Sequence, residues 1–386
     1  MLTAHTGEID YPDEALEEIL SQLDLENALL KNAAGIVHCG CAFAESGFVR
    51  LLCDRLPFEV VGGTTLACAA GREYGADLLS LSVLTSDEVA FSVACSERPA
   101  RDDIEGMIGA AYRRAAADLP ARPALVLAQL PLDLSMGVSR MLDGITAACG
   151  ADVPVFGALP CDMTPDFHES FVICNGEVLP NAVALLLLCG DVRPRFFVEN
   201  VSRSESLQEQ QGVITESDGC LLKRVNDMPF LDYIADIGML PDILKETKAF
   251  PVPFKVNYNE GMKSRLRVLF SVRPEGHAVF SSEMPVGASF SMQRLDYNGV
   301  METVESMADT LSLLRDVSGV LLYSCVARNF LLGRRGDDEM RRFAELLGEK
   351  TPYCFSYTGS EICPAEDEKG ARTNHSYSYS LVACVL

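Results

Sequence analysis

Basic residues are scarce in this chain of 386 residues. Lys and Arg together number 32 against 55 Asp and Glu, which gives a formal net charge of −23 at pH 7. This excess of negative charge repels the phosphates of nucleic acids and the anionic headgroups of lipids. We therefore expect neither nucleic acid nor a membrane among the partners of the protein.

Targeting and membrane-spanning segments are also missing. The first 30 residues contain no Lys or Arg, whereas a signal or transit peptide needs a basic start. The longest uninterrupted apolar run, Ala182–Cys189, is far shorter than the roughly 20 residues that a membrane-spanning helix requires. Both absences favour a cytoplasmic location. The 14 cysteines are accordingly expected to be free, mostly buried thiols.

Two familiar binding motifs are incomplete. The segment His38-Cys39-Gly40-Cys41 lacks the Cys-x-x-Cys spacing of structural zinc sites, and no second pair follows at a usual distance. The run Gly62-Gly63-Thr64-Thr65 lacks the Lys-Ser/Thr of a phosphate-binding P-loop, so we expect a tight turn there. The sequence therefore predicts no bound metal and no cofactor.

Length and composition predict two cooperating domains. A typical domain has about 150 residues, and an apolar content of 48% permits a sizeable core. Residues 12–30 place Pro12 at a helix start and apolar residues at helical spacing, which predicts an amphipathic N-terminal helix. The polar stretch Ser202–Gly212 is the best linker candidate. We expect an N-terminal helical segment at 1–33 and domains at 34–212 and 213–386.

The two expected domains share one pattern of strands and helices. In each, two strands joined by a helix are followed, at similar spacing, by a final apolar strand. The pattern predicts an α/β fold of two related halves, each a mostly parallel (mixed) sheet flanked by helices. Whether the halves arose by duplication stays open, because unrelated α/β domains share such spacings. The strands are Ala124–Gln129, Val153–Gly157 and Val183–Cys189 in the first half, and Gly319–Ser324, Thr351–Phe355 and Ser380–Val385 in the second.

Ligand contacts are expected where these strands end. Open parallel sheets bind ligands beyond the carboxyl ends of their strands. In the loops selected by this rule, Arg328 can bind a ligand carboxylate, and Glu361 or Asp162 can bind an ammonium group. The alternative for these residues is a structural ion pair between the domains. The four selected loops are Gln129–Asp133, Ala158–Asp162, Cys325–Arg328 and Tyr357–Glu361.

Several segments resemble the FIST domains. The first half carries four of them: Gly62-Gly63-Thr64-Thr65, Val155–Leu159 followed by Asp162, Phe171–Cys174 with Asn175-Gly176-Glu177, and Cys189-Gly190-Asp191. The second half carries Ser324–Arg328, and Ser360-Glu361-Ile362 followed by Asn374. The order resembles a FIST N domain followed by a FIST C domain. Ser360 and Ala158 stand where the family usually has Gly.

The resemblance implies an intracellular sensory protein of signal transduction. FIST domains are regarded as modules that bind small ligands, so the chain is expected to bind an amino acid or a similar small polar metabolite. Its output is expected to pass through a signalling protein that the sequence does not identify. The candidate ligand-binding residues are Arg328, Glu361, Cys325, Ser360, Asp162, Asn374, Thr64 and Thr65.

Two other classes of function remain open. A thiol-dependent hydrolase would use Cys325 as its nucleophile, with His375 and an acid such as Glu361 within hydrogen-bond reach. The alternative for Cys325 is a small buried residue that ends a core strand. A protein-binding scaffold would dock a partner on the apolar stripe of the N-terminal helix, which otherwise packs on the protein's own core.

Overall fold

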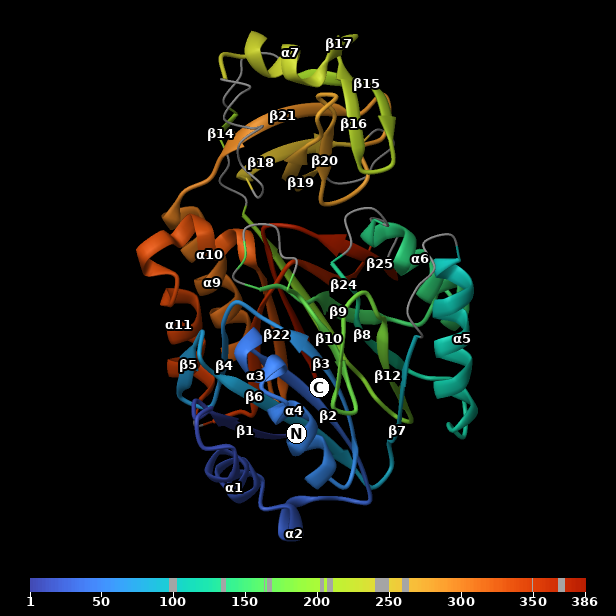
Figure 1. Ribbon diagram of the computed structural model, residues 1–386, viewed down its shortest axis with the longest axis vertical. Coiled ribbons are helices and arrows are strands. Elements are labelled where there is room, and N and C mark those ends of the chain that lie inside the picture. The colour runs from blue at the N-terminus through green and yellow to red at the C-terminus, as the bar shows by residue number, and fades with distance from the viewer. Residues whose placement is uncertain are drawn as a thin grey trace.

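The chain folds into a large body built from three sheets and a small barrel that lies above it (Figure 1). None of the helices in the described part of the chain combines the length and the apolar character needed to cross a membrane. The computed structural model describes residues 1–96, 103–132, 137–162, 164, 169–201, 205–206, 211–239, 250–258, 264–348, 350–366 and 372–386.

The large body, here called the prism, repeats one unit three times. Each unit has an edge strand, a helical segment, a strand, a second helical segment, a parallel strand, a hairpin and a final strand. The first unit comprises β1 (Leu2–Thr6), α1 (Pro12–Leu23), α2 (Leu25–Ala28), β2 (Asn32–Cys39), α3 (Cys41–Glu45), α4 (Phe48–Arg55), β3 (Glu59–Thr64), β4 (Cys68–Ala70), β5 (Glu73–Gly75) and β6 (Leu79–Ser86).

The other two units follow the same order, except that the barrel is inserted after the edge strand of the third. The second unit comprises β7 (Ala90–Cys95), α5 (Ile104–Ala117), β8 (Leu125–Gln129), α6 (Val138–Cys149), β9 (Val155–Leu159), β10 (Val172–Cys174), β11 (Glu177–Leu179) and β12 (Ala184–Cys189). The third comprises β13 (Arg195–Asn200), α9 (Tyr297–Ser312), β22 (Val320–Cys325), α10 (Val326–Leu332), a 3-10 turn (Gly333–Arg335), α11 (Asp338–Leu347), β23 (Tyr353–Thr358), β24 (Ser360–Glu366), β25 (Arg372–Tyr377) and β26 (Ser380–Val385).

The hairpin of each unit belongs to the sheet of another unit. β4–β5 of the first unit extends the third sheet, β10–β11 of the second extends the first, and β24–β25 of the third extends the second. The strand orders are therefore β1-β6-β2-β3-β10-β11, β7-β12-β8-β9-β24-β25 and β13-β26-β22-β23-β4-β5. Each sheet has one parallel pair and is otherwise antiparallel. This cyclic exchange interlocks the three units.

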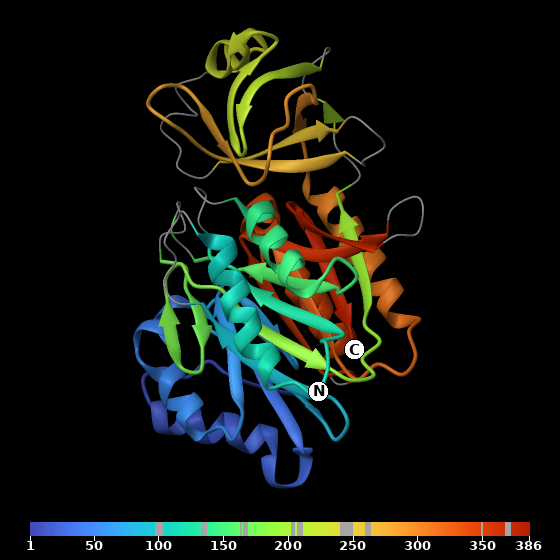
Figure 2. The ribbon, with the colours of Figure 1, turned by 90° about the vertical axis from the view of Figure 1, so that its right-hand side faces the viewer.

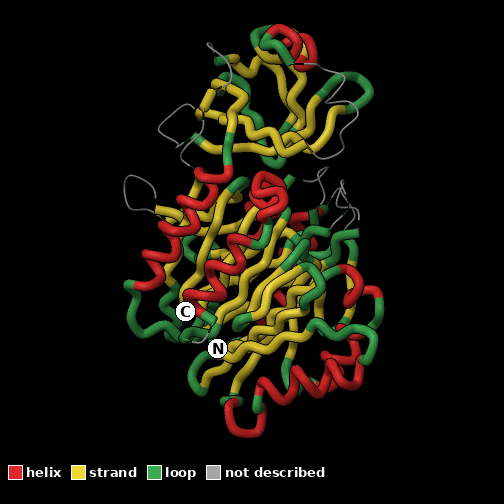
Figure 3. Tube along the Cα trace, turned by 90° about the vertical axis from the view of Figure 1, so that its left-hand side faces the viewer, coloured by secondary structure: helices red, strands yellow, loops and turns green. Residues whose placement is uncertain are grey.

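The core of the prism lies where the three sheets face one another. Apolar residues from all three sheets form a single buried cluster, to which Ile36, Phe156 and Tyr323 each contribute from a different sheet. Separate clusters lie between each sheet and its own helices: α1 and α4 on the first, α5 and α6 on the second, and α9 and α11 on the third. The helices accordingly lie on the outside of the prism (Figure 3).

The expected N-terminal helix is present as α1. Pro12 occupies its first turn together with two acidic residues, which suits the positive end of the helix dipole. Its buried residues Ala15, Leu16, Ile19 and Leu23 belong to the cluster beneath the first sheet. The apolar stripe is therefore covered by the protein's own core and is not an open docking surface.

The expected α/β architecture of mixed sheets flanked by helices is confirmed, and the structure extends it. The sheets of the prism are mostly antiparallel and not mostly parallel as expected, because the final strand of each unit and the exchanged hairpin both pair antiparallel. The final strands predicted at Val183–Cys189 and Ser380–Val385 correspond to β12 and β26, and both are buried throughout. To the two related halves the structure adds a third copy of the unit over residues 2–86. The domain division at residue 212 stays a prediction, and part of the expected linker lies outside the described residues.

The run of glycines at 62–63 is a strand and not the expected tight turn. Both residues lie in β3, where a Cβ on Gly62 would come within 1.9 Å of the Val37 carbonyl oxygen. Gly157 occupies the equivalent position on β9, and its Cβ would lie 2.0 Å from the Ala128 carbonyl oxygen. Glycine is needed here because the two parallel strands of a unit approach closely.

The barrel is a closed ring of antiparallel strands. The order β21-β15-β16-β20-β19-β18 returns to β21, and four phenylalanines from β18, β20, β21 and α7 fill the centre. β19 packs against the prism through Leu266, Val268 and Phe270. Figure 2 shows the barrel at one end of the prism. The barrel segment comprises β14 (Glu205–Ser206), β15 (Gly212–Asp218), β16 (Leu221–Val225), β17 (Met228–Pro229), α7 (Phe230–Asp236), β18 (Phe250–Asn257), β19 (Arg265–Val272), β20 (Ala278–Phe280) and β21 (Ser289–Arg294).

Candidate functional site

The carboxyl ends of β3, β9 and β23 meet, as the strand-end rule requires. Thr65 Oγ1 donates a hydrogen bond of 2.7 Å to the carbonyl of Tyr357, and the Cys161 amide donates to the carbonyl of Thr64 at 3.1 Å. The Gly359 amide donates to the carbonyl of Leu159 at 2.8 Å. Segments far apart in the sequence are thereby joined at one place.

Glu361 is the most perturbed acid at this junction. Its side chain is fully buried and accepts hydrogen bonds from Thr358 Oγ1 at 2.9 Å and Ser380 Oγ at 2.5 Å. Burial raises the pKa of the carboxyl to about 8, and the hydrogen bonds from the two hydroxyls and the nearby Arg328 oppose this rise. Glu361 is therefore mostly protonated at pH 7 and is a poor counter-ion for a ligand ammonium group.

Arg328 is enclosed between α9, α10 and α11. Its guanidinium is fully buried and donates to Glu339 Oε1 from Nη2 at 2.7 Å and from Nε at 3.1 Å. Nη2 also donates to Thr303 Oγ1 at 2.8 Å. We expected Arg328 in a loop, but the chain enters α10 directly after β22, and this turns the side chain toward α9 and α11. Its observed partners are those of a structural ion pair.

Four further candidate residues hold the backbone in place. Asp162 accepts hydrogen bonds from the amides of Thr164 and Glu169, and Thr64 Oγ1 accepts one from the amide of Phe171. Asn374 bridges to the start of β9, accepting from the Val155 amide at 2.8 Å and donating to the Val153 carbonyl at 3.0 Å. Ser360 donates to the carbonyl of Tyr377 at 2.7 Å.

The structure does not pair Cys325 with His375. Cys325 is fully buried near Glu361, and burial raises the pKa of its thiol well above the ordinary value. His375 is half-buried on β25, opposite Cys363 on β24, and hydrogen bonds with Thr373 through Nε2 at 2.8 Å. The neighbouring Glu361 is itself mostly protonated at pH 7, and a protonated thiol without an ionised base beside it is a poor nucleophile. This arrangement gives the hydrolase hypothesis no support.

Two arginines on β19 form the most distinctive polar group in the seam between the barrel and the prism. Arg267 is 3% exposed and donates to the hydroxyl of Tyr258 from Nε at 3.0 Å and from Nη2 at 2.6 Å. The Arg265 guanidinium lies over the ring of Tyr377 on β25, with Cζ 5.5 Å from the ring centre. The pair therefore spans both bodies.

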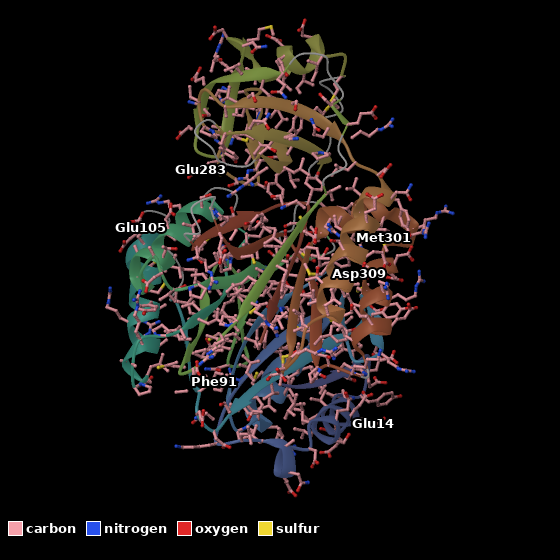
Figure 4. All side chains as sticks on the ribbon, turned by 180° about the vertical axis from the view of Figure 1, so that it is seen from behind. Glu14, Phe91, Glu105, Glu283, Met301 and Asp309 are labelled. Carbon is pink, nitrogen blue, oxygen red and sulfur yellow. The ribbon has the colours of Figure 1, made fainter. Side chains whose placement is uncertain are left out.

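No carboxylate among the described residues forms an ion pair with Arg265 or Arg267. Burial and the neighbouring Arg267 lower the pKa of Arg265, and only tyrosines oppose the change. Burial, Arg265 and Arg267 also lower the pKa of His375 to about 4, so the imidazole is neutral. Glu283, labelled at the lower edge of the barrel in Figure 4, is exposed and is not paired with either arginine. In the part of the chain that the structure describes, the seam thus carries two cations without an ion-pair partner, in a chain of net charge −23.

A cavity of about 10 Å³ lies in the same seam. Cys220 is one of its lining residues. Burial and the nearby Glu283 raise the pKa of the Cys220 thiol, and Arg267 opposes this rise. Neutral hydroxyl pairs bridge the two bodies nearby: Ser281 with Ser378 at 2.9 Å and Ser139 with Ser282 at 3.1 Å. The lining residues are Leu132, Gly137, Val138, Leu159, Cys220, Phe270, Phe280, Ser281 and Ser360.

The arginine pair was missed at the level of sequence, although a signal was present. The segment 266–281 reads as hairpin-like, and Arg265-Leu266-Arg267 begins it with two cations in alternation. Residues two apart on a strand share a face. Two cations on one strand face of so acidic a protein are a reason to look for an anion.

The chain matches the profiles of two known domains. The FIST N domain profile matches residues 33–228, and the FIST C domain profile matches residues 233–364. The chain belongs to the FIST family. FIST domains are sensory domains of signal transduction, so the expected family and its general role are confirmed.

Neither curated proteins nor solved structures extend this family assignment. A search of curated proteins gives no match. Among solved structures, a cyanuric acid hydrolase from A. caulinodans matches with 12% sequence identity and a TM-score of 0.29, covering 51% of this chain and 70% of that one. A match at this level does not establish a shared fold or a shared reaction.

Proposed function

We propose that this FIST protein is a sensor that binds a small anionic metabolite, such as an amino acid or another carboxylate, at the seam between the barrel and the prism. The observation that carries the proposal is the pair of Arg265 and Arg267, neither of which has a carboxylate partner among the described residues. Arginine binds carboxylates and phosphates through two parallel hydrogen bonds, which suits it to such a ligand.

The energetics of the pair support an anion as the ligand. Taking an ion out of water costs several kcal/mol unless an opposite charge compensates it. Arg267 is almost fully buried, yet its side-chain acceptor is the neutral hydroxyl of Tyr258. Arg265 is close enough to Arg267 for each cation to disfavour the other. A bound carboxylate would offset both costs at once.

Ligand entry would have to move the barrel relative to the prism. The cavity of about 10 Å³ has space for roughly one water molecule. Among the described residues, the polar bridges across the seam are two serine pairs and one cation–π contact, each worth about 1 kcal/mol. We therefore propose that binding changes the barrel–prism arrangement and that a signalling partner reads this change.

A thermal-shift screen against amino acids, dicarboxylates and inorganic phosphate tests the proposal. A ligand at 100 times its Kd stabilises the folded state by about 2.7 kcal/mol, which gives a measurable rise in Tm. For a ligand so found, Arg265→Gln or Arg267→Gln should weaken binding by about 10- to 150-fold, the loss of one charge-assisted hydrogen bond.

Arg294→Gln is the matched control. Arg294 lies on β21 of the same barrel, but it is exposed and already paired with Glu205 at 3.0 Å. This variant should bind the ligand with unchanged affinity. Equal binding by the wild type and both seam variants would place the ligand elsewhere, and the absence of any shift across all three ligand classes would refute the anionic ligand.

A further inference from the structure

A cavity of about 350 Å³ lies in the third unit of the prism, between the last turns of α9 and α11. Helix α9 runs away from the barrel, since Asp309 lies further from the barrel than Met301 in Figure 4, so the cavity is remote from the seam. Its volume falls within the range of small-molecule sites, about 300–1,000 Å³. The lining residues are Leu311, Ser312, Leu314, Arg315, Asp316, Val317, Val320, Leu346, Leu347, Lys350 and Thr351.

The second unit shows how the corresponding gap between two helix ends, here called the notch, is closed. Arg122, in the connection from α5 to β8, donates to the carbonyl of Cys149 at the end of α6, from Nε at 3.0 Å and from Nη2 at 2.7 Å. Its Nη1 also donates to Asp152 Oδ2 at 2.9 Å. The guanidinium therefore joins the two connections that follow the helices and fills the notch between them.

Backbone hydrogen bonds align the second and third units residue by residue. The Val126 amide donates to the Pro154 carbonyl in the second unit, and the Val320 amide donates to the Pro352 carbonyl in the third, both at 3.0 Å. Each bond joins the two parallel strands of its unit at their first residues. Residues at equal distances along the chain from these bonds are therefore equivalent.

This alignment shows that the two charges of the notch are exchanged in the third unit. Asp316 takes the place of Arg122, and Lys350 takes the place of Asp152. A carboxylate cannot donate to a carbonyl, and the negative end of α11 repels it. The Leu347 carbonyl accepts instead from the backbone amide of Lys350 at 2.8 Å. Within the described part of the chain no ion pair closes this notch, and the cavity lies there.

The walls of the cavity are apolar and its rim is charged. Arg315 and Lys350 are exposed, and neither has a carboxylate partner among the described residues. With Asp316, the described lining residues comprise two cations and one acid, so one positive charge is in excess. The apolar lining residues belong to or pack against the cluster between the third sheet and its helices: Leu311, Leu314, Val317, Val320, Leu346 and Leu347.

We propose that this cavity binds an amphipathic monoanion, a molecule with an apolar group of medium size and one carboxylate or similar acid. The apolar group lies against the leucines, and the acid lies between Arg315 and Lys350. In the second unit the chain supplies both members of the ion pair, whereas in the third the ligand supplies the anion. The net charge of −23 repels anions elsewhere, so they bind only where cations gather.

Fluorescence titration with 8-anilinonaphthalene-1-sulfonate tests the proposal, because this amphipathic monoanion becomes fluorescent in apolar surroundings. We expect saturable binding, and displacement of the probe by octanoate. Acetate lacks the apolar group and 1-octanol lacks the charge, so each should need at least about fivefold higher concentration, the equivalent of about 1 kcal/mol. Equal displacement by 1-octanol, or by the zwitterion leucine, would overturn the assigned ligand class.

Variants locate the bound probe. The double variant Asp316→Arg/Lys350→Asp copies the pair of the second unit, so it should close the notch and abolish binding while the far-UV circular dichroism stays unchanged. Lys350→Gln removes one exposed cation and should weaken binding about fivefold. Arg342→Gln, on the same helix α11 but outside the cavity, should bind as the wild type does.

The seam provides a second control, because this site does not depend on the ligand proposed there. Arg265→Gln should leave the affinity for the probe unchanged even if it weakens binding at the seam. The proposal is overturned if the wild type does not bind the probe, or if Lys350→Gln and the double variant both bind it as tightly as the wild type.

Discussion

Breaking the buried pair of Arg328 and Glu339 should be among the most costly single changes in this protein. Neither side chain exposes any surface, and two hydrogen bonds of 2.7 and 3.1 Å join them. Glu339 also accepts a hydrogen bond of 3.1 Å from the Tyr357 hydroxyl. Removing one partner of a buried ion pair costs about 3–5 kcal/mol, because the other charge is left uncompensated. We expect Glu339→Gln to lower the free energy of unfolding by that amount.

Urea unfolding followed by far-UV circular dichroism measures this loss. The double variant Arg328→Met/Glu339→Leu should recover most of it, because an apolar pair of similar volume removes both charges together. Arg342→Gln is the control. Arg342 lies on the same helix α11 and pairs with Glu305 at 2.8 Å, but both side chains are partly exposed, so this change should cost at most about 1 kcal/mol.

The outcome also decides the role of Arg328. If Glu339→Gln costs no more than Arg342→Gln, the guanidinium does not depend on Glu339. The reasoning that assigns Arg328 to a structural pair would then be refuted. A large loss that the apolar double variant reverses would confirm it.

Two further predictions concern the junction of the units. Since the pKa of Glu361 is raised to about 8, the folded state keeps a proton that the unfolded state has lost, so stability should fall as pH rises from about 5 to 8, by up to about 1.4 kcal/mol per pH unit. Glu361→Gln should remove this part of the slope in urea unfolding, and identical slopes would contradict the assignment. Gly62→Ala should cost about 1–3 kcal/mol, because its Cβ would overlap the Val37 carbonyl. Gly7→Ala, whose Cβ would lie 3.6 Å from the nearest atom, should be neutral by comparison.

Local pattern was sufficient to predict most individual elements. Alternation, apolar runs and helix starts indicate α1, β12 and β26, because burial and capping leave their mark within a few residues. The exchange of hairpins was not predictable. β4 has three residues, and its partner β23 lies almost 300 residues away, so nothing in the short segment specifies the pairing. The third repeat went unrecognised for the same reason.

The candidate residues show where reasoning from strand ends succeeds and fails. The rule brings Thr65, Cys161 and Glu361 to one junction, because the carboxyl ends of parallel strands do converge. The rule cannot tell whether a polar atom there is free or already hydrogen-bonded. Thr64 and Asn374 bond to the backbone of a neighbouring unit, and Ser360 bonds to the backbone of its own unit. Arg328 was misplaced because its partner Glu339 lies on a helix eleven residues further along the chain.

The barrel is where the three otherwise similar units of the prism differ. The connection from edge strand to helix runs from Thr6 to Pro12 in the first unit, whereas in the third it carries the whole barrel between Asn200 and Tyr297. The repeat of the unit explains several polar side chains at the junction, such as Thr64 and Asn374, because they hydrogen bond to the backbone of a neighbouring unit. It does not explain Arg265 and Arg267, which stability alone would disfavour. We therefore assign the sensory role to the inserted barrel and its seam, and the repeated prism to its support.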